Sequence, residues 1–420
     1  MIADKELAIV NELRASVAGY ERWMTKILTD LVRIESPSHQ PEAVNQAVDR
    51  VAAEIDKLGG RVRRHRVQGY GDLLEARLGR RSKGTRTVML LGHLDTVWPI
   101  GTLRTMPFRV EAGRAYGPGV FDMKAGVVMA LAALRALQES AALDFSALDF
   151  SGSEVVLLLN SDEEVGSHAS RPLTEKLALE ARAVFVLEPA QGEQGAYKTA
   201  RKGVGQFRLQ VTGRAAHSGV DFTAGHSAVL ELGRQLERIA SLTDLERGIT
   251  VNPGVIGGGT QANVIAATAW AEIDLRVKTK GDETRIERQL RALRPVDKEC
   301  RLEWSGELNR PPMERTPETV RLFRQAQALA ERMGMPLQEA ATGGGSDGNF
   351  TSALGVPTLD GMGAVGNGAH AEDESIQLDS LVPRAALLAG MIAKTIKEKA
   401  ETRSPVATST RKRASHVDGD

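Results

Sequence analysis

The chain has 420 residues, and its 54 basic and 54 acidic side chains leave no formal net charge, which favours neither nucleic acid nor an anionic membrane as a partner. Its length favours two domains, and its 42% hydrophobic and 26% charged residues are typical of a soluble globular protein. The single cysteine excludes a disulfide framework and a cysteine-rich metal site. The sequence shows no secretory signal and no apolar run long enough to span a membrane, which predicts a cytoplasmic protein.

The first part of the chain alternates helical and extended patterns. Apolar residues at helical spacing predict helices over Glu6–Val32 and Pro41–Leu58, and alternating strands follow at Arg61–Val67 and Leu73–Leu78. The continuous apolar run Val88–Leu91 is typical of a strand buried on both faces of a parallel sheet. This order of elements favours an α/β fold.

Polar side chains follow this buried strand. His93 and Asp95 come directly after it, and Asp122 follows a glycine-rich loop and precedes a predicted helix over Ala125–Leu137. Ligands of open α/β sheets bind at the carboxyl ends of the strands, and an imidazole with carboxylate oxygens suits zinc, manganese or cobalt. A hydrogen-bonded strand end at His93 and Asp95, with a helix cap at Asp122, is the alternative explanation.

Two further predicted strands end in acidic residues. Glu154–Leu159 leads into Asp162-Glu163-Glu164, and Ala183–Leu187 ends at Glu188. Consecutive acids at the end of a buried strand are unfavourable unless a cation lies beside them, although a helix N-terminus also favours acids. The polar segment 142–153 ahead of the first of these strands is expected to be an exposed loop.

The segment 202–311 differs in character and is predicted to be an inserted second domain between two parts of the first, 1–201 and 312–400. Its patterns follow a βαββαβ-like order: Gln206–Thr212, Ala224–Leu242, Ile249–Ile256, Thr268–Lys278, Asp282–Leu293 and Glu299–Trp304. The first domain then resumes with helices over Thr319–Met333 and Leu381–Lys397, a short strand over Val356–Leu359 and glycine-rich loops ahead of Asp347 and His370. The polar tail 401–420 is expected to be disordered.

Strand ends and loops together supply too many carboxylates for one metal ion. The candidate residues are His93, Asp95, Asp122, Glu163, Glu164, Glu188 and His370. One ion takes about four ligands, whereas two ions about 3.5–4 Å apart that share a carboxylate accommodate the set. The residues therefore predict a dinuclear hydrolytic site.

These motifs, in this order, resemble the dizinc aminoacylase/carboxypeptidase family, which includes bacterial glutamate carboxypeptidase, acetylornithine deacetylase and succinyl-diaminopimelate desuccinylase. The resemblance covers most of the chain ahead of the tail and rests on Gly92–Val97, Tyr116–Gly119, Asp122–Lys124, Asp162–Ser167, Glu188-Pro189, Gly213 with Ala216–Gly219, Gly343–Asp347 and His370. It implies a zinc-exopeptidase-like mixed sheet flanked by helices, with an inserted α+β ferredoxin-like lid and dimerisation domain. A homodimer is therefore expected.

The resemblance also implies a role for each metal ligand. His93 and Glu188 would bind one Zn²⁺, Glu164 and His370 would bind the other, and Asp122 would bridge them. Co²⁺ or Mn²⁺ could replace zinc.

Other residues would act around the metals. Asp95 would orient His93, and Glu163 would be the general base that deprotonates a water bridging the two ions. His217 resembles a lid histidine that reaches the partner subunit's site and stabilises the oxyanion, with a turn histidine as the alternative.

Three more residues resemble groups that contact the substrate. Asn263 and Arg276 resemble lid residues that contact its carboxylate, and Arg310 resembles another substrate-side arginine. For Arg276, pairing with Asp274 is the alternative. The sequence departs from the family after His370, where Ala371–Glu374 replaces a frequent hydroxyl residue and is expected to alter the surroundings of the second ion.

The resemblance implies hydrolysis of an amide bond that releases a C-terminal amino acid, with glutamate favoured, from acyl, peptidyl or folate-like substrates. Residues Val97–Thr102 resemble the glutamate carboxypeptidase branch more than the desuccinylases. The alternatives are an N-acyl amino acid deacylase, a dipeptidase, or a non-catalytic binding protein, which the intact ligand set disfavours. The glycine runs lack the Gly-Lys-Ser/Thr ending of a phosphate loop, which excludes a nucleotide site of that kind.

Overall fold

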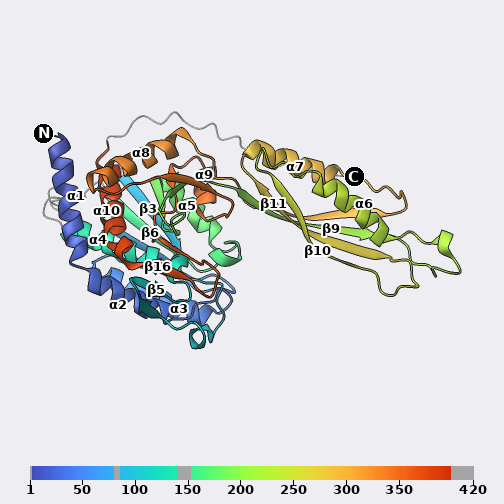
Figure 1. Cartoon of the computed structure of the whole chain (residues 1–420), viewed down its shortest axis with the longest axis horizontal. Helices are drawn as coiled ribbons and strands as arrows, with labels where there is room; N and C mark the ends of the chain where they lie inside the picture. The colour runs from blue at the N-terminus through green and yellow to red at the C-terminus, as the bar shows by residue number, and fades with distance from the viewer. Residues whose placement is uncertain (1, 80–85, 140–152, 399–420) are drawn as a thin grey trace, which may run out of the picture.

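The computed structural model describes residues 2–79, 86–139 and 153–398, so most of the predicted loop 142–153 and all of the predicted tail 401–420 lie outside the described residues. Figure 1 shows a larger body that contains the N-terminal helices and the last helix, and an elongated body that extends from it. The elongated body is formed by residues 203–310 and is called the insert below.

The larger body is built on a six-stranded sheet. Its strands, in spatial order, are β1 (Arg61–His65), β2 (Leu73–Gly79), β6 (Ser153–Asn160), β3 (Arg86–His93), β7 (Ala181–Val186) and β14 (Thr358–Leu359). The last four run parallel, and β1 and β2 are antiparallel, so the sheet is mixed. Strand β3 lies between two parallel neighbours, and residues Val88–Leu91 are fully buried, as their continuous apolar run predicts.

Helices cover both faces of this sheet. One face packs against α1 (Ile2–Ala18), α2 (Glu21–Val32), α4 (Ala125–Glu139), α8 (Pro317–Arg332) and α10 (Leu381–Lys397). The other packs against α5 (Arg171–Glu180) and α9 (Gly348–Ala353), while α3 (Pro41–Lys57) contacts β1 and β2. Because side chains alternate along a strand, Val88 and Leu90 enter the first core and Met89 and Leu91 the second.

The predicted class, a mixed sheet flanked by helices, is confirmed, but the single helix predicted over Glu6–Val32 is wrong. The structure has two helices there, because the chain turns at Gly19, whose amide donates to the carbonyls of Ala15 and Ser16. Glycine is a poor helix former, so a helix can end at Gly19 although the helical apolar spacing continues on both sides of it. Among the described residues, no helix is long and apolar enough to cross a membrane.

Two small sheets hold the loops that surround the carboxyl end of the central sheet. One pairs β13 (Glu339–Thr342) with β8 (Tyr197–Arg201). The other has the order β15 (Gly366–Asn367), β16 (Ser375–Gln377), β5 (Arg114–Tyr116) and β4 (Arg109–Glu111). The second sheet was not predicted, because strands of two or three residues are too short to show an alternating pattern.

The insert has its own sheet and core. Its antiparallel strands, in spatial order, are β10 (Thr250–Gly258), β11 (Thr268–Val277), β9 (Gly203–Thr212) and β12 (Arg301–Arg310). Helices α6 (Ala228–Ala240) and α7 (Lys280–Ala292) complete the predicted βαββαβ order and pack on the apolar side of the sheet. The chain therefore enters the insert at Gly203 and leaves it at Arg310.

Candidate dinuclear metal centre

The predicted ligands converge at the carboxyl end of the parallel strands. His93 ends β3, Glu164 lies in a short turn after β6, and Glu188 follows β7 by two residues. Asp122 lies in an irregular turn (Val120–Lys124) before α4, and His370 lies in the loop between β15 and β16. Strand ends of a parallel sheet meet at one edge, so residues far apart in the sequence come together here.

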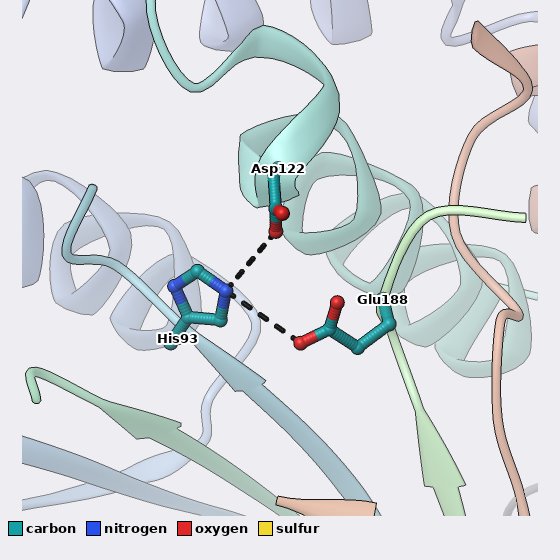
Figure 2. A group of neighbouring side chains, drawn as sticks. All are labelled: His93, Asp122 and Glu188. Carbon is teal, nitrogen blue, oxygen red and sulfur yellow. Dashed lines mark hydrogen bonds and ion pairs between the residues drawn. The ribbon is translucent and has the colours of Figure 1, made fainter. Parts of the chain in front are cut away.

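The side chains form two groups that share Asp122. His93, Asp122 and Glu188 form one group, and Asp122, Glu164 and His370 form the other, with the donor atoms of each group within 4.8 Å of one another. In the first group, Nε2 of His93 lies 3.3 Å from Oδ1 of Asp122 and 3.7 Å from Oε1 of Glu188 (Figure 2). In the second, Nε2 of His370 lies 3.6 Å from Oδ2 of Asp122 and 3.2 Å from Oε2 of Glu164. Asp122 thus presents one oxygen to each group.

The electrostatics of these groups fit divalent cations. Burial raises the pKa of Glu164 to about 7 and that of Glu188 to about 7, because ionised carboxylates are costly in a buried site. Hydrogen bonds to Asp122 and Glu164 raise the pKa of His370 to about 10. Oε1 of Glu164 is buried and has no hydrogen-bond partner among the residues that the structure describes. Imidazole and carboxylate donors are ligands that Zn²⁺, Mn²⁺ and Co²⁺ accept, so each group fits one such ion.

The helix-terminus alternatives for Asp122, Glu163 and Glu164 do not fit the structure. Helix α4 begins at Ala125, and the carboxylate of Asp122 faces the two histidines instead of capping that helix. Helix α5 begins at Arg171, several residues after Glu164. Of the three consecutive acids, only Asp162 binds backbone amides ahead of that helix, those of Ala169 and Ser170.

The carboxylate and backbone carbonyl of Asp95 lie beside the His93 ring. Nδ1 of His93 lies 3.0 Å from the carbonyl oxygen of Asp95 and 3.5 Å from its carboxylate. The two oxygens of Asp95 also accept hydrogen bonds from the backbone amides of Glu163 (3.2 Å) and Glu164 (3.1 Å), and one accepts from Ser38 Oγ (2.7 Å). The buried Asp95 carboxylate therefore connects the His93 ring to the turn after β6.

Glu374 is a functional candidate that the sequence did not assign. Its fully buried carboxylate accepts hydrogen bonds from the backbone amides of Gly119 (2.8 Å), Phe121 (2.8 Å) and Asp122 (3.0 Å), and from Nε1 of Trp98 (2.8 Å). It therefore fixes the turn that presents the shared carboxylate. The acidic segment after His370 is unusual in the sequence, but no local pattern predicts that Glu374 contacts the turn at Asp122.

Glu163 lies beside the two ligand groups and pairs with Arg310. Nη2 of Arg310 lies 2.6 Å from Oε1 of Glu163, and Nη1 lies 3.0 Å from Oδ1 of Asp347. Burial raises the pKa of Glu163, and the Arg310 guanidinium opposes that shift. Arg310, which the resemblance predicts to contact the substrate, is buried against these two carboxylates.

Two of the insert residues predicted to act at the site, His217 and Asn263, are not brought to it within one chain. His217 and Asn263 are exposed neighbours, since the amide of Ser218 donates to the carbonyl of Asn263. They follow and precede the distal ends of β9 and β11, and the ten residues of β9 span about 33 Å at the usual rise per residue. Their predicted roles would therefore need a second copy of the chain.

Arg276 lies at the other end of the insert, close to the larger body. Its Nε is 2.9 Å from Oδ2 of Asp274, the pairing that the sequence offered as an alternative. Its Nη1 also lies 3.4 Å from the carbonyl oxygen of Gly343. The side chain is thus near the glycine-rich loop that borders the site and is still partly exposed.

Comparisons with known proteins agree with this geometry. The sequence profile of Peptidase family M20/M25/M40 matches residues 89–394. The chain is 28% identical to carboxypeptidase G2 of Pseudomonas sp. (strain RS-16), over 87% of this chain and 88% of that protein. It is 29% identical to acetylornithine deacetylase of Myxococcus xanthus, over 64% of this chain and 70% of that one.

A solved structure shows the same fold. Aminopeptidase PepT of Bacillus cereus has a TM-score of 0.73 at 20% identity, over 90% of this chain and 99% of that chain. These findings confirm the family resemblance that the motifs indicated.

Proposed function

The chain belongs to Peptidase family M20/M25/M40, and we propose that it hydrolyses an amide bond to release a C-terminal glutamate from acyl, peptidyl or folate-like substrates. The observation that carries the proposal is the pair of ligand groups that share Asp122, with the carboxylate of Glu163 beside them. The similarity to carboxypeptidase G2 over most of both chains supports the carboxypeptidase reaction. We propose zinc as the native metal, with cobalt or manganese as alternatives.

The chain's own residues then have defined tasks. Two divalent ions in these groups would lower the pKa of water and polarise the scissile carbonyl. Glu163 takes the proton of the attacking water and passes it to the leaving amine. Asp95 keeps the His93 ring oriented through its Nδ1 side, which leaves Nε2 for the metal.

Cations at the base of the insert support recognition of an acidic amino acid. Val277 pairs with Gly203 across β11 and β9, so Lys278 and Lys202 follow as the next residues on the two chains. Arg276 lies two residues before Lys278, near the end of β11. Burial and the nearby charges of Lys278 and Arg276 lower the pKa of Lys202. A released glutamate carries two carboxylates, which would neutralise such a cluster of like charges.

We propose that a homodimer completes the site. Strand β10 is an edge strand of the insert, and it exposes Val255 (50%) and Ile256 (60%). Exposed apolar edge strands favour pairing with another chain. His217, which lies far from its own metal groups, would then reach those of the second copy and stabilise the developing oxyanion, with Asn263 near the substrate.

An N-acyl amino acid deacylase is the second candidate, because acetylornithine deacetylase is also similar to this chain; a dipeptidase is the third. All three reactions cleave an amide near a carboxylate, so substrate tests must separate them. We expect the metal-loaded enzyme to release glutamate from folate and acyl-glutamates, and Glu163→Gln to keep two ions but lose the activity. Cleavage of N-acetyl amino acids or dipeptides alone would contradict the carboxypeptidase proposal.

A further inference from the structure

We propose that Arg310 positions the general base Glu163 and does not bind the substrate. This inference rests on the proposed function of Glu163 in amide hydrolysis. It assigns to Arg310 a role different from the substrate contact that the sequence suggested, and it follows from the contacts at the two ends of the guanidinium.

One nitrogen of Arg310 fixes the conformation of Glu163. Nη2 lies 2.6 Å from the carboxylate oxygen Oε1 and 2.9 Å from the backbone carbonyl oxygen of the same residue. A donor shared by the side chain and the backbone of one residue restricts the rotamer of that side chain. Within the described part of the chain, Oε2 of Glu163 accepts no hydrogen bond, so this oxygen is the one available for proton transfer.

The other nitrogen is anchored in a buried network. Nη1 lies 3.0 Å from Oδ1 of Asp347, and Asp347 also accepts hydrogen bonds from Nδ2 of Asn160 (2.6 Å) and from the hydroxyl of Ser167. The guanidinium carbon lies 5.1 Å from the centre of the Phe350 ring. Turning this arginine towards a substrate would leave two buried carboxylates without their cation, which is strongly unfavourable.

The loop Gly343–Asp347 contacts the residues at both borders of the insert. At the entry to the insert, Arg201 pairs with Asp360 (2.7 Å) and lies 3.8 Å from Glu188, and Ser346 Oγ donates to the same Asp360 (2.6 Å). At the exit, Asp347 holds Arg310. Ser346 thus supports the carboxylate that pairs with Arg201, and the adjacent Asp347 pairs directly with Arg310. Arg201 lies beside a proposed metal ligand, and Arg310 lies beside the proposed base.

Gly345 is needed for this packing. A Cβ atom at this position would lie 2.7 Å from Cδ of Arg310 and 2.9 Å from a methyl group of Val204. Close packing against the arginine thus explains the glycine at position 345, the last of the three in the motif.

The test is a double-mutant cycle between Arg310 and Glu163, with kcat and KM measured separately on the metal-loaded enzyme. Arg310→Gln is expected to lower kcat by about 10²-fold, with little change in KM and with two ions still bound. In the Glu163→Gln background the same substitution should have almost no further effect on kcat, because residues that act as a unit are not additive. Arg310→Lys should restore part of kcat, since an ammonium can still donate to Oε1.

Arg276→Gln is the matched control, because Arg276 is proposed to contact the substrate carboxylate. It should raise KM and weaken the preference for a substrate with a free α-carboxylate over its carboxamide analogue. If Arg310→Gln behaves in this way, with kcat unchanged, the positioning role is wrong.

A second variant covers a failure of Arg310→Gln to fold. Asp347→Asn leaves Arg310 and Glu163 in place but removes the charge that anchors Arg310, and it should lower kcat in the same manner. A wild-type kcat in both Asp347→Asn and Arg310→Lys would overturn the proposal. Wild-type enzyme that cleaves no amide substrate, or active Glu163→Gln, would refute the proposed function itself, so the two failures are distinguishable.

Discussion

Replacing Glu374 with glutamine should weaken the metal site, although Glu374 is not itself a proposed metal ligand. Oε2 of Glu374 accepts from the Gly119 amide and the Trp98 indole, and Oε1 accepts from the amides of Phe121 and Asp122, all at 2.8–3.0 Å. A glutamine side chain has one acceptor oxygen, so its NH₂ group would face two N–H donors. The change therefore removes two hydrogen bonds to a charged acceptor and places donors against donors.

The magnitude follows from these bonds. Each hydrogen bond to a charged group contributes about 1.5–3 kcal/mol, so the loss of two should lower the free energy of unfolding by about 3–6 kcal/mol. That is a large part of the usual stability of a folded protein, which is about 5–15 kcal/mol. If the turn holding Asp122 loosens instead, metal affinity should fall by about 10–100-fold, as is usual when a residue supporting a ligand is lost.

Two measurements check this expectation: bound metal per chain after dialysis against graded free zinc, and urea unfolding. Burial raises the pKa of Glu374, so the comparison is made at about pH 8, well above the ordinary pKa of a glutamate. Glu372→Gln, an exposed change of the same type two residues earlier, is the matched control and should have no effect. Trp98→Phe removes one of the four donors and should have a smaller effect. Unchanged metal affinity and unchanged stability in Glu374→Gln would refute the reasoning.

Three further predictions concern the dimer, the metals and a buried lysine. If His217 acts in the site of a second copy, mixing and reassociating inactive His217→Ala and Glu163→Gln chains should restore about one quarter of the wild-type activity. Half of the dimers then contain one chain of each kind, and one of the two sites in such a dimer is intact. If His217 acts within its own chain, activity assays after mixing should show no recovery. Chelation should abolish activity, and adding zinc, cobalt or manganese should restore it. Where the free metal concentration is about 1,000 times the Kd, removing one ion should lower the free energy of unfolding by about 4 kcal/mol. A melting temperature that chelation leaves unchanged would contradict tight binding to the folded state. Burial lowers the pKa of Lys198 to about 8, whereas a lysine in an unfolded chain has a pKa of about 10.4. Between these two pH values the unfolded state binds more protons than the folded state. The free energy of unfolding should therefore rise with pH in this range, by up to about 3 kcal/mol. Urea unfolding of Lys198→Met should show a smaller rise over the same pH range, and an equal rise would mean that other groups cause it.

The metal ligands were predictable because each lies in a local pattern. His93 and Glu188 follow apolar runs that end as buried strands, and the topology of a parallel sheet brings such ends together. The βαββαβ order of the insert was predictable for a similar reason, since its strands and helices are long enough to show their periods. By contrast, the helix break at Gly19 and the strands of two or three residues gave no pattern that exceeds chance.

Contacts between distant segments could not be derived from local patterns. Glu374 and Asp122 are 252 residues apart, and Arg310 and Glu163 are 147 residues apart. An acid or arginine in a loop has many candidate partners in a chain with 54 residues of each sign, and only the packed fold selects among them. The motif around Arg310 thus predicted a residue of the site that contacts the substrate, whereas in the structure the guanidinium pairs with Glu163.

This difference has a consequence for specificity within the family. If Arg310 is committed to Glu163 and Asp347, the cations left to recognise a substrate carboxylate are those at the base of the insert, Arg276 with Lys202 and Lys278. Reaction chemistry and substrate recognition would then reside on different segments, the strand ends of the central sheet and the proximal end of β11. Substitutions at Arg276 or Lys278 should therefore change which amino acid is released, while substitutions at Arg310 should change the rate for every substrate alike.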